Sequence, residues 1–296
     1  MSTPPYPARL HVLLARNSPK AVVIRRGPAR QVCTIGWDRS DDTWTMGQWL
    51  KGRIYEYNSD LSPDGQHLVY GALKGYRNGE WEGFYTVVSR APYLRALAWW
   101  TTLCGAEGGF FDGARSLRSL GQPERRTGRP GGVTVRWMPT LALPPGFPEL
   151  PVYWARLQRD GWRHVYGRRI GQVGLIERLA YRVRAGNAAA DGCTVLAAAH
   201  EKPVAGEWFL RKVVRRNRGR RPGFGPVCEH HELLHVPTGR LLDQPGWEWA
   251  DVDGGRLLWA EAGCLYAGAL HDSGLTGVRL LRDFNGMTFE PLVAPY

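Results

Sequence analysis

The sequence predicts an all-β protein, a β-propeller of four or five blades that are each a four-stranded antiparallel sheet. Its 296 residues include 37 Gly and 21 Pro, which indicate frequent turns. Its 13 Trp and 12 Tyr favour strands and half-buried sheet faces. No long window keeps an apolar helical period, so few helices are expected. A large β-sandwich is the alternative that the same pattern allows.

The clearest strand pattern lies in residues 247–289. An acidic-glycine turn at Asp253-Gly254-Gly255 separates two alternating apolar runs, which is a strong short-range signal for a hairpin. A second turn is expected at Ala262-Gly263. Four strands follow from this pattern, over Ala250–Val252, Arg256–Ala260, Cys264–Leu270 and Val278–Asp283. Together they predict one antiparallel sheet.

An earlier stretch, Ser59–Tyr70, is built in the same way. Asp64-Gly65 aligns with Gly254-Gly255, and Leu68-Val69-Tyr70 aligns with Leu257-Leu258-Trp259. The repetition suggests a recurring blade. Roughly sixteen to twenty strands are expected in the whole chain, and at four strands per blade this number predicts four or five blades.

The other expected strands follow one another along the chain as a β-meander, in which each strand pairs with the next. In the first part of the chain the predicted strands are Leu10–Ala15, Ala21–Arg25, Gln31–Trp37, Thr43–Thr45, Arg53–Tyr57, Trp81–Ser89 and Leu94–Trp100. A turn-rich break is expected at Gly47–Gly52. In the second part they are Val152–Leu157, Thr194–Ala199, Glu207–Val214, His231–Val236 and Arg240–Asp243. Leu175–Arg184 is the best helix candidate, because three apolar residues could share one face, but a strand fits there equally.

Two segments depart most from the repeat, residues 105–151 and 211–227. They are predicted as irregular insertions in a single domain, residues 1–296. Within the first, Gly121–Gly132 is expected to be a loop and Pro139–Pro151 a strap on the surface of the sheets. Because loops carry recognition on rigid scaffolds, Gly121–Pro151 and Arg211–Gly225 within these insertions are expected to be functional.

The turn Leu61-Ser62-Pro63-Asp64-Gly65 resembles the SPDG turn of TolB-like and WD-type β-propeller repeats. Asp160-Gly161 and Asp253-Gly254 share the Asp-Gly pair of that turn, whereas no GH…WD pair recurs. The resemblance implies the propeller fold. Propellers of this sort usually serve as platforms for partner proteins, though some are hydrolases.

The net charge of +12 is the unusual bulk property. It permits contact with nucleic acid, an acidic partner or an anionic membrane, but the favoured interpretation is an Arg-rich composition whose charge is spread over solvated faces. The N-terminus has no signal-peptide pattern, and Leu10–Ala15 is too short to span a bilayer. Five widely spaced cysteines contain no CxxC pair. A cytoplasmic protein with free thiols is therefore expected.

The segment His231-Glu232-Leu233-Leu234-His235 matches the HExxH signature of zinc metallopeptidases. On a helix, His231 and His235 would bind zinc and Glu232 would act as general base. Pro237 follows too closely for the last turn of such a helix. On a strand, Glu232 would point away from both histidines. Metal binding by His231 and His235 is therefore a minor alternative, and no cofactor is predicted.

A basic run spans residues 211–221. Its cationic side chains are Arg211, Lys212, Arg215, Arg216, Arg218, Arg220 and Arg221. Such a cluster could neutralise several phosphates of a nucleic acid, and Phe224 could stack on a base. The alternatives are a solvated loop and a contact with an acidic protein.

No P-loop and no GxSxG nucleophile motif occur in the chain. The acidic pairs Asp60/Asp64 and Asp251/Asp253 are interpreted as turn residues that accept local backbone hydrogen bonds. The sequence therefore predicts a non-catalytic protein-binding or scaffolding module, an accessory subunit of a larger bacterial assembly. Nucleic-acid binding through the basic run is the first alternative, and a zinc metallopeptidase is the second.

Overall fold

The computed structural model describes residues 6–27, 31–73, 83–102, 108–138, 150–166, 193–217 and 227–296. Within these ranges the chain forms 21 strands and one helix, α1. The predicted all-β class is confirmed, with slightly more strands than expected. Over the same ranges, no helix has the length and apolar character that a membrane crossing needs.

Strands β1 to β12 form three sheets. Their bounds are β1 Arg9–Leu14, β2 Lys20–Arg26, β3 Gln31–Asp38, β4 Thr43–Lys51, β5 Arg53–Leu61, β6 His67–Leu73, β7 Phe84–Arg90, β8 Ala96–Thr102, β9 Gly109–Gly113, β10 Ser116–Leu120, β11 Pro123–Gly128 and β12 Thr134–Met138. The first sheet has the order β1-β2-β3-β4, the second β11-β8-β7-β6-β5 and the third β12-β10-β9. The first two are antiparallel, and the third contains one parallel pair, β10 with β12.

The second half of the chain adds helix α1 and two antiparallel sheets. The bounds are α1 Pro151–Arg159, β13 Arg163–Tyr166, β14 Cys193–Pro203, β15 Trp208–Asn217, β16 Val227–His235, β17 Arg240–Gln244, β18 Trp247–Asp253, β19 Arg256–Glu261, β20 Cys264–His271 and β21 Gly274–Asp283. The fourth sheet has the order β13 to β17, and the fifth β18 to β21, each in chain order. The fifth is the sheet predicted from residues 247–289.

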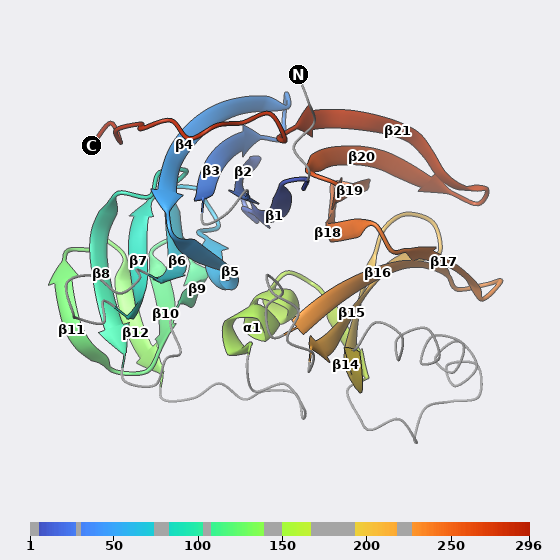
Figure 1. Ribbon diagram of the computed structural model, residues 1–296. Coiled ribbons are helices and arrows are strands. Elements are labelled where there is room, and N and C mark those ends of the chain that lie inside the picture. The colour runs from blue at the N-terminus through green and yellow to red at the C-terminus, as the bar shows by residue number, and fades with distance from the viewer. Residues whose placement is uncertain are drawn as a thin grey trace.

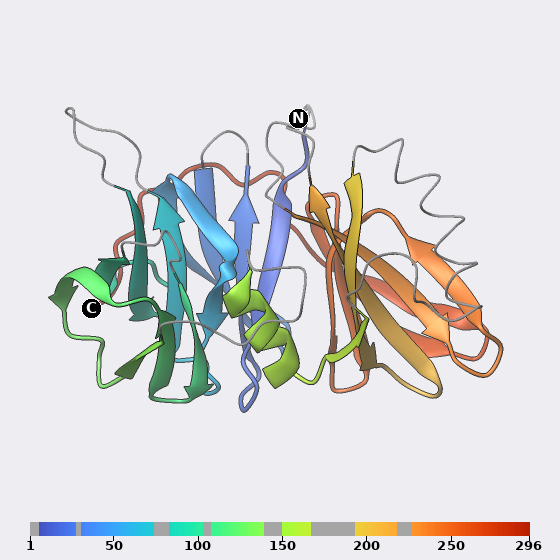
Figure 2. The same cartoon turned by 90° about the horizontal axis from the view of Figure 1, so that it is seen from below.

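The five sheets stand side by side around a centre (Figure 1). Strand β1 contacts β5 and β18, β5 contacts β9, and β16 contacts β18. Helix α1 contacts β5, β9 and β13, and so completes the ring between the third and fourth sheets. Figure 2 shows the ring from the side, with the hairpin turns gathered at its two ends. This is the arrangement of a propeller, and the sandwich alternative, with two sheets face to face, does not describe it.

Apolar side chains fill the spaces between neighbouring sheets. Val23 and Ile35 of the first sheet share a core with Leu258 of the fifth. On its other face the first sheet packs through Ile24 against Leu68 of the second sheet. The alternation of side chains along each strand explains this pattern, because successive residues face opposite neighbours in the ring.

Residues 152–157 form a helix, and the prediction of a strand there was wrong. Pro151 occupies the first turn, where its fixed φ suits a helix and its missing N–H costs nothing. Tyr153 and Leu157 are buried at a spacing of four residues. A helix of nine residues is too short to show a clear period in the sequence, which explains the error.

The predicted loop Gly121–Gly132 is also wrong, because it contains β11, which pairs antiparallel with β8. Most of β11 is exposed, so it lacks the apolar alternation that reveals a half-buried strand. Similarly, β4 continues through the expected break and ends at Lys51. The helix candidate Leu175–Arg184 and most of the strap at Pro139–Pro151 lie outside the described residues.

Candidate functional site

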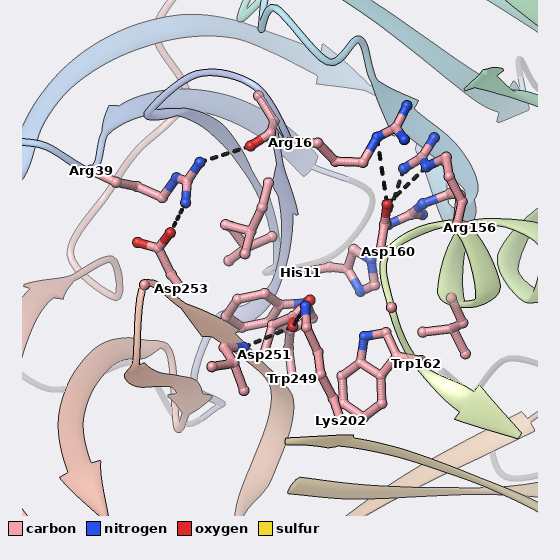
Figure 3. Close-up of a pocket in the computed structure, with 18 of the residues that line it drawn as sticks. His11, Arg16, Arg39, Arg156, Asp160, Trp162, Lys202, Trp249, Asp251 and Asp253 are labelled. Carbon is pink, nitrogen blue, oxygen red and sulfur yellow. Dashed lines mark hydrogen bonds and ion pairs between the residues drawn. The ribbon is translucent and has the colours of Figure 1, made fainter. Parts of the chain in front are cut away.

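A cavity of about 680 Å³ lies at the centre of the ring, where the first, fourth and fifth sheets meet helix α1. We call it the central cavity (Figure 3). Its walls come from β1 and the turn after it, the β3–β4 turn, α1 and the turn after it, β14, β15 and β18. Its volume is within the range of small-molecule sites in proteins.

Helix α1 and the turn that follows it form one wall. Arg156 and Arg159 are three residues apart, so both side chains leave the same face of the helix. The helix ends at Arg159 and is capped by Asp160, and Gly161 takes a φ of +84°, a conformation that favours glycine. The backbone N–H of Trp162 then donates to the carbonyl of Leu157 at 2.9 Å. This turn directs Asp160 and Trp162 into the cavity wall.

Three arginines share two carboxylates at this wall; we call Arg16, Arg156 and Arg159 the arginine cluster. Arg159 pairs with Asp60 and also donates to Asp160, with Nε 2.8 Å from Oδ1. Arg156 Nε lies 3.4 Å from Asp60 Oδ1, and Arg16 Nε lies 3.9 Å from Asp160 Oδ1. With both acids ionised, the cluster keeps one positive charge in excess.

The two carboxylates differ in their surroundings. Asp60 is 2% exposed, and it also accepts a hydrogen bond from the backbone N–H of Phe111 at 2.7 Å. Burial raises the pKa of Asp160, and the Arg159 guanidinium opposes this shift. Any protonation of Asp160 adds to the positive excess of the arginine cluster.

On the opposite wall, each cation that lines the cavity has a carboxylate partner, and Asp253 is shared with Arg256. Asp251 and Asp253 alternate with Val252 on β18, so both carboxylates face the same way. Lys202 Nζ lies 2.6 Å from Asp251, and Arg39 pairs with Asp253. The interpretation of these acids as local turn residues was incomplete, because their main partners belong to other sheets. The same holds for Asp60, whereas Asp64 does bond within its own turn.

The floor of the cavity holds a buried polar group of Lys212, Tyr153 and Glu229. Lys212 Nζ lies 2.9 Å from the Tyr153 hydroxyl and 3.8 Å from a Glu229 carboxylate oxygen. The Tyr153 hydroxyl also bonds to Glu229. Burial lowers the pKa of Lys212 and raises the pKa values of Glu229 and Tyr153. The lysine charge is therefore already matched by its own carboxylate.

His11 of β1 lines the cavity and lies beside Arg156 and Asp160 (Figure 3). It is 6% exposed, and its Nε2 has no hydrogen-bond partner in the described part of the chain. Burial lowers the pKa of His11 well below 6.5, and the nearby cations of Arg156 and Lys212 lower it further. The imidazole is therefore neutral at pH 7 and has an unused polar atom.

The HExxH segment lies on strand β16, not on a helix. His231 is buried and its Nδ1 lies 3.1 Å from the Trp247 carbonyl, whereas His235 packs on Trp208 and lies 2.8 Å from the Thr238 hydroxyl. Four residues along a strand separate the two histidines by about 13 Å. That distance is too large for both imidazoles to bind one metal ion.

The described residues of the basic run lie on β15, where the first two, Arg211 and Lys212, are buried. Arg211 is 9% exposed and donates to Glu201, and Lys212 is 2% exposed, so their burial does not fit the predicted surface role. Arg215 and Arg216 continue β15 away from the cavity. The remaining predicted residues, Arg218, Arg220, Arg221 and Phe224, lie outside the described residues.

No known family and no curated protein matches the chain. Among solved structures, the uncharacterized protein lmo1340 of Listeria monocytogenes EGD-e is 8% identical to this chain, with a TM-score of 0.25. The match covers 89% of this chain and 60% of that protein, which is less than two thirds of its length. The β-propeller domain of Cps50 (Swd1) from Myceliophteria thermophila is 10% identical with a TM-score of 0.27, covering 94% and 88%. Both TM-scores lie below 0.5, so the fold is assigned from the strand pairings of this chain and not from these two structures.

Proposed function

We propose that this protein is a non-catalytic binding module that recognises a protein partner with the end of the ring around the central cavity. The supporting observation is that hairpin turns from different sheets are bonded to one another at this end. We call these turns the cavity-end turns: β1–β2, β3–β4, β5–β6, α1–β13 and β18–β19. A surface held in one arrangement before binding loses less entropy when a partner docks.

Backbone and side-chain bonds join the cavity-end turns. The N–H of Asn17 in the β1–β2 turn donates to Pro63 in the β5–β6 turn at 2.8 Å. In the β3–β4 turn, Asp42 lies 3.4 Å from Arg256 and 2.6 Å from Arg279 of the fifth sheet. These contacts connect the first sheet to the second and to the fifth, which supports a role for this end as a recognition surface.

The test is a tagged pull-down from the native cell with nuclease treatment and mass spectrometry. Arg16 reaches the surface at the rim, with 31% of its side chain exposed, so Arg16→Glu changes the proposed surface without entering the core. Lys51 is an exposed cation at the end of β4, away from the cavity-end turns, so Lys51→Glu is the matched control.

Capture of a defined protein after nuclease, lost with Arg16→Glu and kept with Lys51→Glu, is the expected result. Equal capture by the two variants would overturn the proposed surface. Loss of all captured material on nuclease treatment would overturn the protein partner in favour of nucleic acid. The chain's charge of +12 would then account for the binding.

A further inference from the structure

We propose that the central cavity binds a small molecule with an oxyanion head group, a carboxylate or a phosphate, held between the arginine cluster and His11. This goes beyond recognition of a protein partner, because it assigns the cavity a ligand of its own. The cavity of about 680 Å³ has room for a ligand larger than the head group alone.

The position of unmatched charge locates the head group. Of the other cations that line the cavity, Lys202, Lys212 and Arg39 each have a carboxylate partner, and Arg39 shares its partner Asp253 with Arg256, which lies outside the lining. The arginine cluster has two carboxylates for three guanidiniums, and Arg16 is its loosest member, 3.9 Å from Asp160. A planar guanidinium suits carboxylate and phosphate oxygens because it can donate two parallel hydrogen bonds.

His11 supplies the second, independent observation. A buried polar atom without a partner costs free energy, and such atoms are rare in proteins without a reason. The Nε2 atom of His11 is in this state, in a side chain that lines the cavity. In the tautomer that carries its proton on Nε2, the neutral imidazole donates to an oxyanion. A ligand oxygen would therefore satisfy this atom.

The rest of the cavity wall suits an organic body behind the head group. The indoles of Trp162 and Trp249 line the cavity, at 3% and 2% exposure. Lys212 Nζ lies 4.7 Å from the centre of the Trp162 ring, so the cation already occupies one approach to that indole. A flat apolar group of modest size fits this lining better than a long flexible chain, whose ordering would cost more entropy.

Isothermal titration calorimetry on the full chain tests the proposal with inorganic phosphate and with benzoate, at constant ionic strength. Benzamide is the neutral control, because it keeps the ring of benzoate and lacks the charge. Saturable binding of either anion, with benzamide at least about tenfold weaker, is expected. Phosphate alone would indicate a phosphate head group, and benzoate alone a carboxylate. Binding of neither anion, or equal binding of benzamide, would overturn the proposal.

Variants place the head group. Arg16→Gln and His11→Gln should each weaken the anion by about tenfold, the effect of one charge-assisted or buried hydrogen bond. Lys51→Gln removes an exposed cation away from the cavity and should leave the affinity unchanged. Arg16 is at the rim, so its variant remains informative even if His11→Gln does not fold. Equal losses in Arg16→Gln and Lys51→Gln would overturn the site, whatever the outcome of the partner capture.

Discussion

Arg39 and Asp253 form an ion pair that joins the β3–β4 turn to the β18–β19 turn, and thereby the first sheet to the last. The Arg39 side chain is 8% exposed and that of Asp253 is 19% exposed. The same guanidinium donates to the carbonyl oxygens of Ala15 and Ser18, at 2.8 and 2.6 Å. One side chain therefore connects three of the cavity-end turns.

Arg39→Met should lower the free energy of unfolding by about 2 kcal/mol or more, because the carbonyls of Ala15 and Ser18 lose a donor and Asp253 is left with Arg256 alone. Methionine keeps much of the apolar stem, so the loss reports mainly on the charged group. Urea unfolding followed by tryptophan fluorescence measures it.

Arg279→Met is the matched control for Arg39. Arg279 also pairs with an acid of the β3–β4 turn, Asp42 at 2.6 Å, but its side chain is 60% exposed. An exposed pair contributes about 1 kcal/mol or less. If the two variants lost the same stability, the assignment of ring closure to Arg39 would be wrong.

The fifth sheet could be predicted from the sequence because its pairings are local. Each of its strands pairs with its neighbour in the chain. The turn residues Asp253-Gly254-Gly255 and Ala262-Gly263 indicate in the sequence where the chain changes direction. Gly254 and Gly255 take φ values of +54° and +85°, which glycine adopts without strain. Local turn chemistry and alternation therefore carry enough information for this part of the fold.

The central cavity could not be predicted, because its charges meet across the ring. Asp60 and Arg159 are 99 residues apart, and neither has a sequence neighbour that signals the pair. Lys212 was misread for a related reason: within a basic run it looks exposed, but its partner Glu229 is on the next strand, β16. A single sequence shows which residues are charged, and only the fold shows which charges are matched.

Asp60→Asn should change stability and anion binding in opposite directions. The substitution leaves Arg156 and Arg159 with less negative charge in a buried place, so we expect a loss of about 3 kcal/mol in the free energy of unfolding. The arginine cluster gains one unit of positive charge in excess, so phosphate or benzoate should bind more tightly. Urea unfolding and calorimetry measure the two effects on the same sample.

Asp112→Asn is the control for the Asp60 variant. Asp112 pairs with Arg118 at 2.6 Å, but the two side chains are 25% and 42% exposed. This pair lies outside the lining of the central cavity. The control should lose about 1 kcal/mol or less. Asp112 acts on Arg16 from outside the lining, so its removal should change anion affinity by less than Asp60→Asn does. A weaker anion affinity in Asp60→Asn would contradict the charge count of the arginine cluster.

Stability should fall as the pH drops below about 6.5, because buried histidines stay neutral in the folded chain. Burial, followed by His164 and Lys212, lowers the pKa of His200 to about 3. The pKa values of His11 and His231 are also lowered, chiefly by burial. Between the folded and unfolded pKa values the unfolded state binds more protons, so acid favours unfolding. Above about pH 7.5 these three groups add almost no pH dependence, because the histidines are then neutral in the unfolded chain as well.

His200→Gln isolates one of these contributions. Between about pH 7.5 and about pH 5.5, each such histidine should account for about 1.4 kcal/mol of lost stability. The variant also loses the stacking of His200 on Trp154, but that loss is the same at both pH values. The quantity to compare between the variant and the wild type is therefore the change in the free energy of unfolding from the higher pH to the lower one. An unchanged pH dependence would show that folding does not lower the pKa of His200.

Gly161→Ala should lower the free energy of unfolding by about 1 kcal/mol, because alanine is strained at the φ of +84° that ends helix α1. A Cβ at this position meets no atom within 4 Å, so the cost reports backbone conformation and not a clash. Gly286→Ala is the matched control: its Cβ also meets nothing within 4 Å, and its φ lies outside the positive range. The control should stay within about 0.5 kcal/mol of the wild type.

The Gly161 turn also positions the cavity wall, so the same variant tests how stability and binding are connected. If relief of the strain shifts Asp160 and Trp162, the arginine cluster loses its arrangement and anion affinity should fall with stability. Gly286→Ala should leave the affinity unchanged. A Gly161→Ala protein that loses stability but binds phosphate or benzoate as the wild type does would show that the turn supports the fold and not the site.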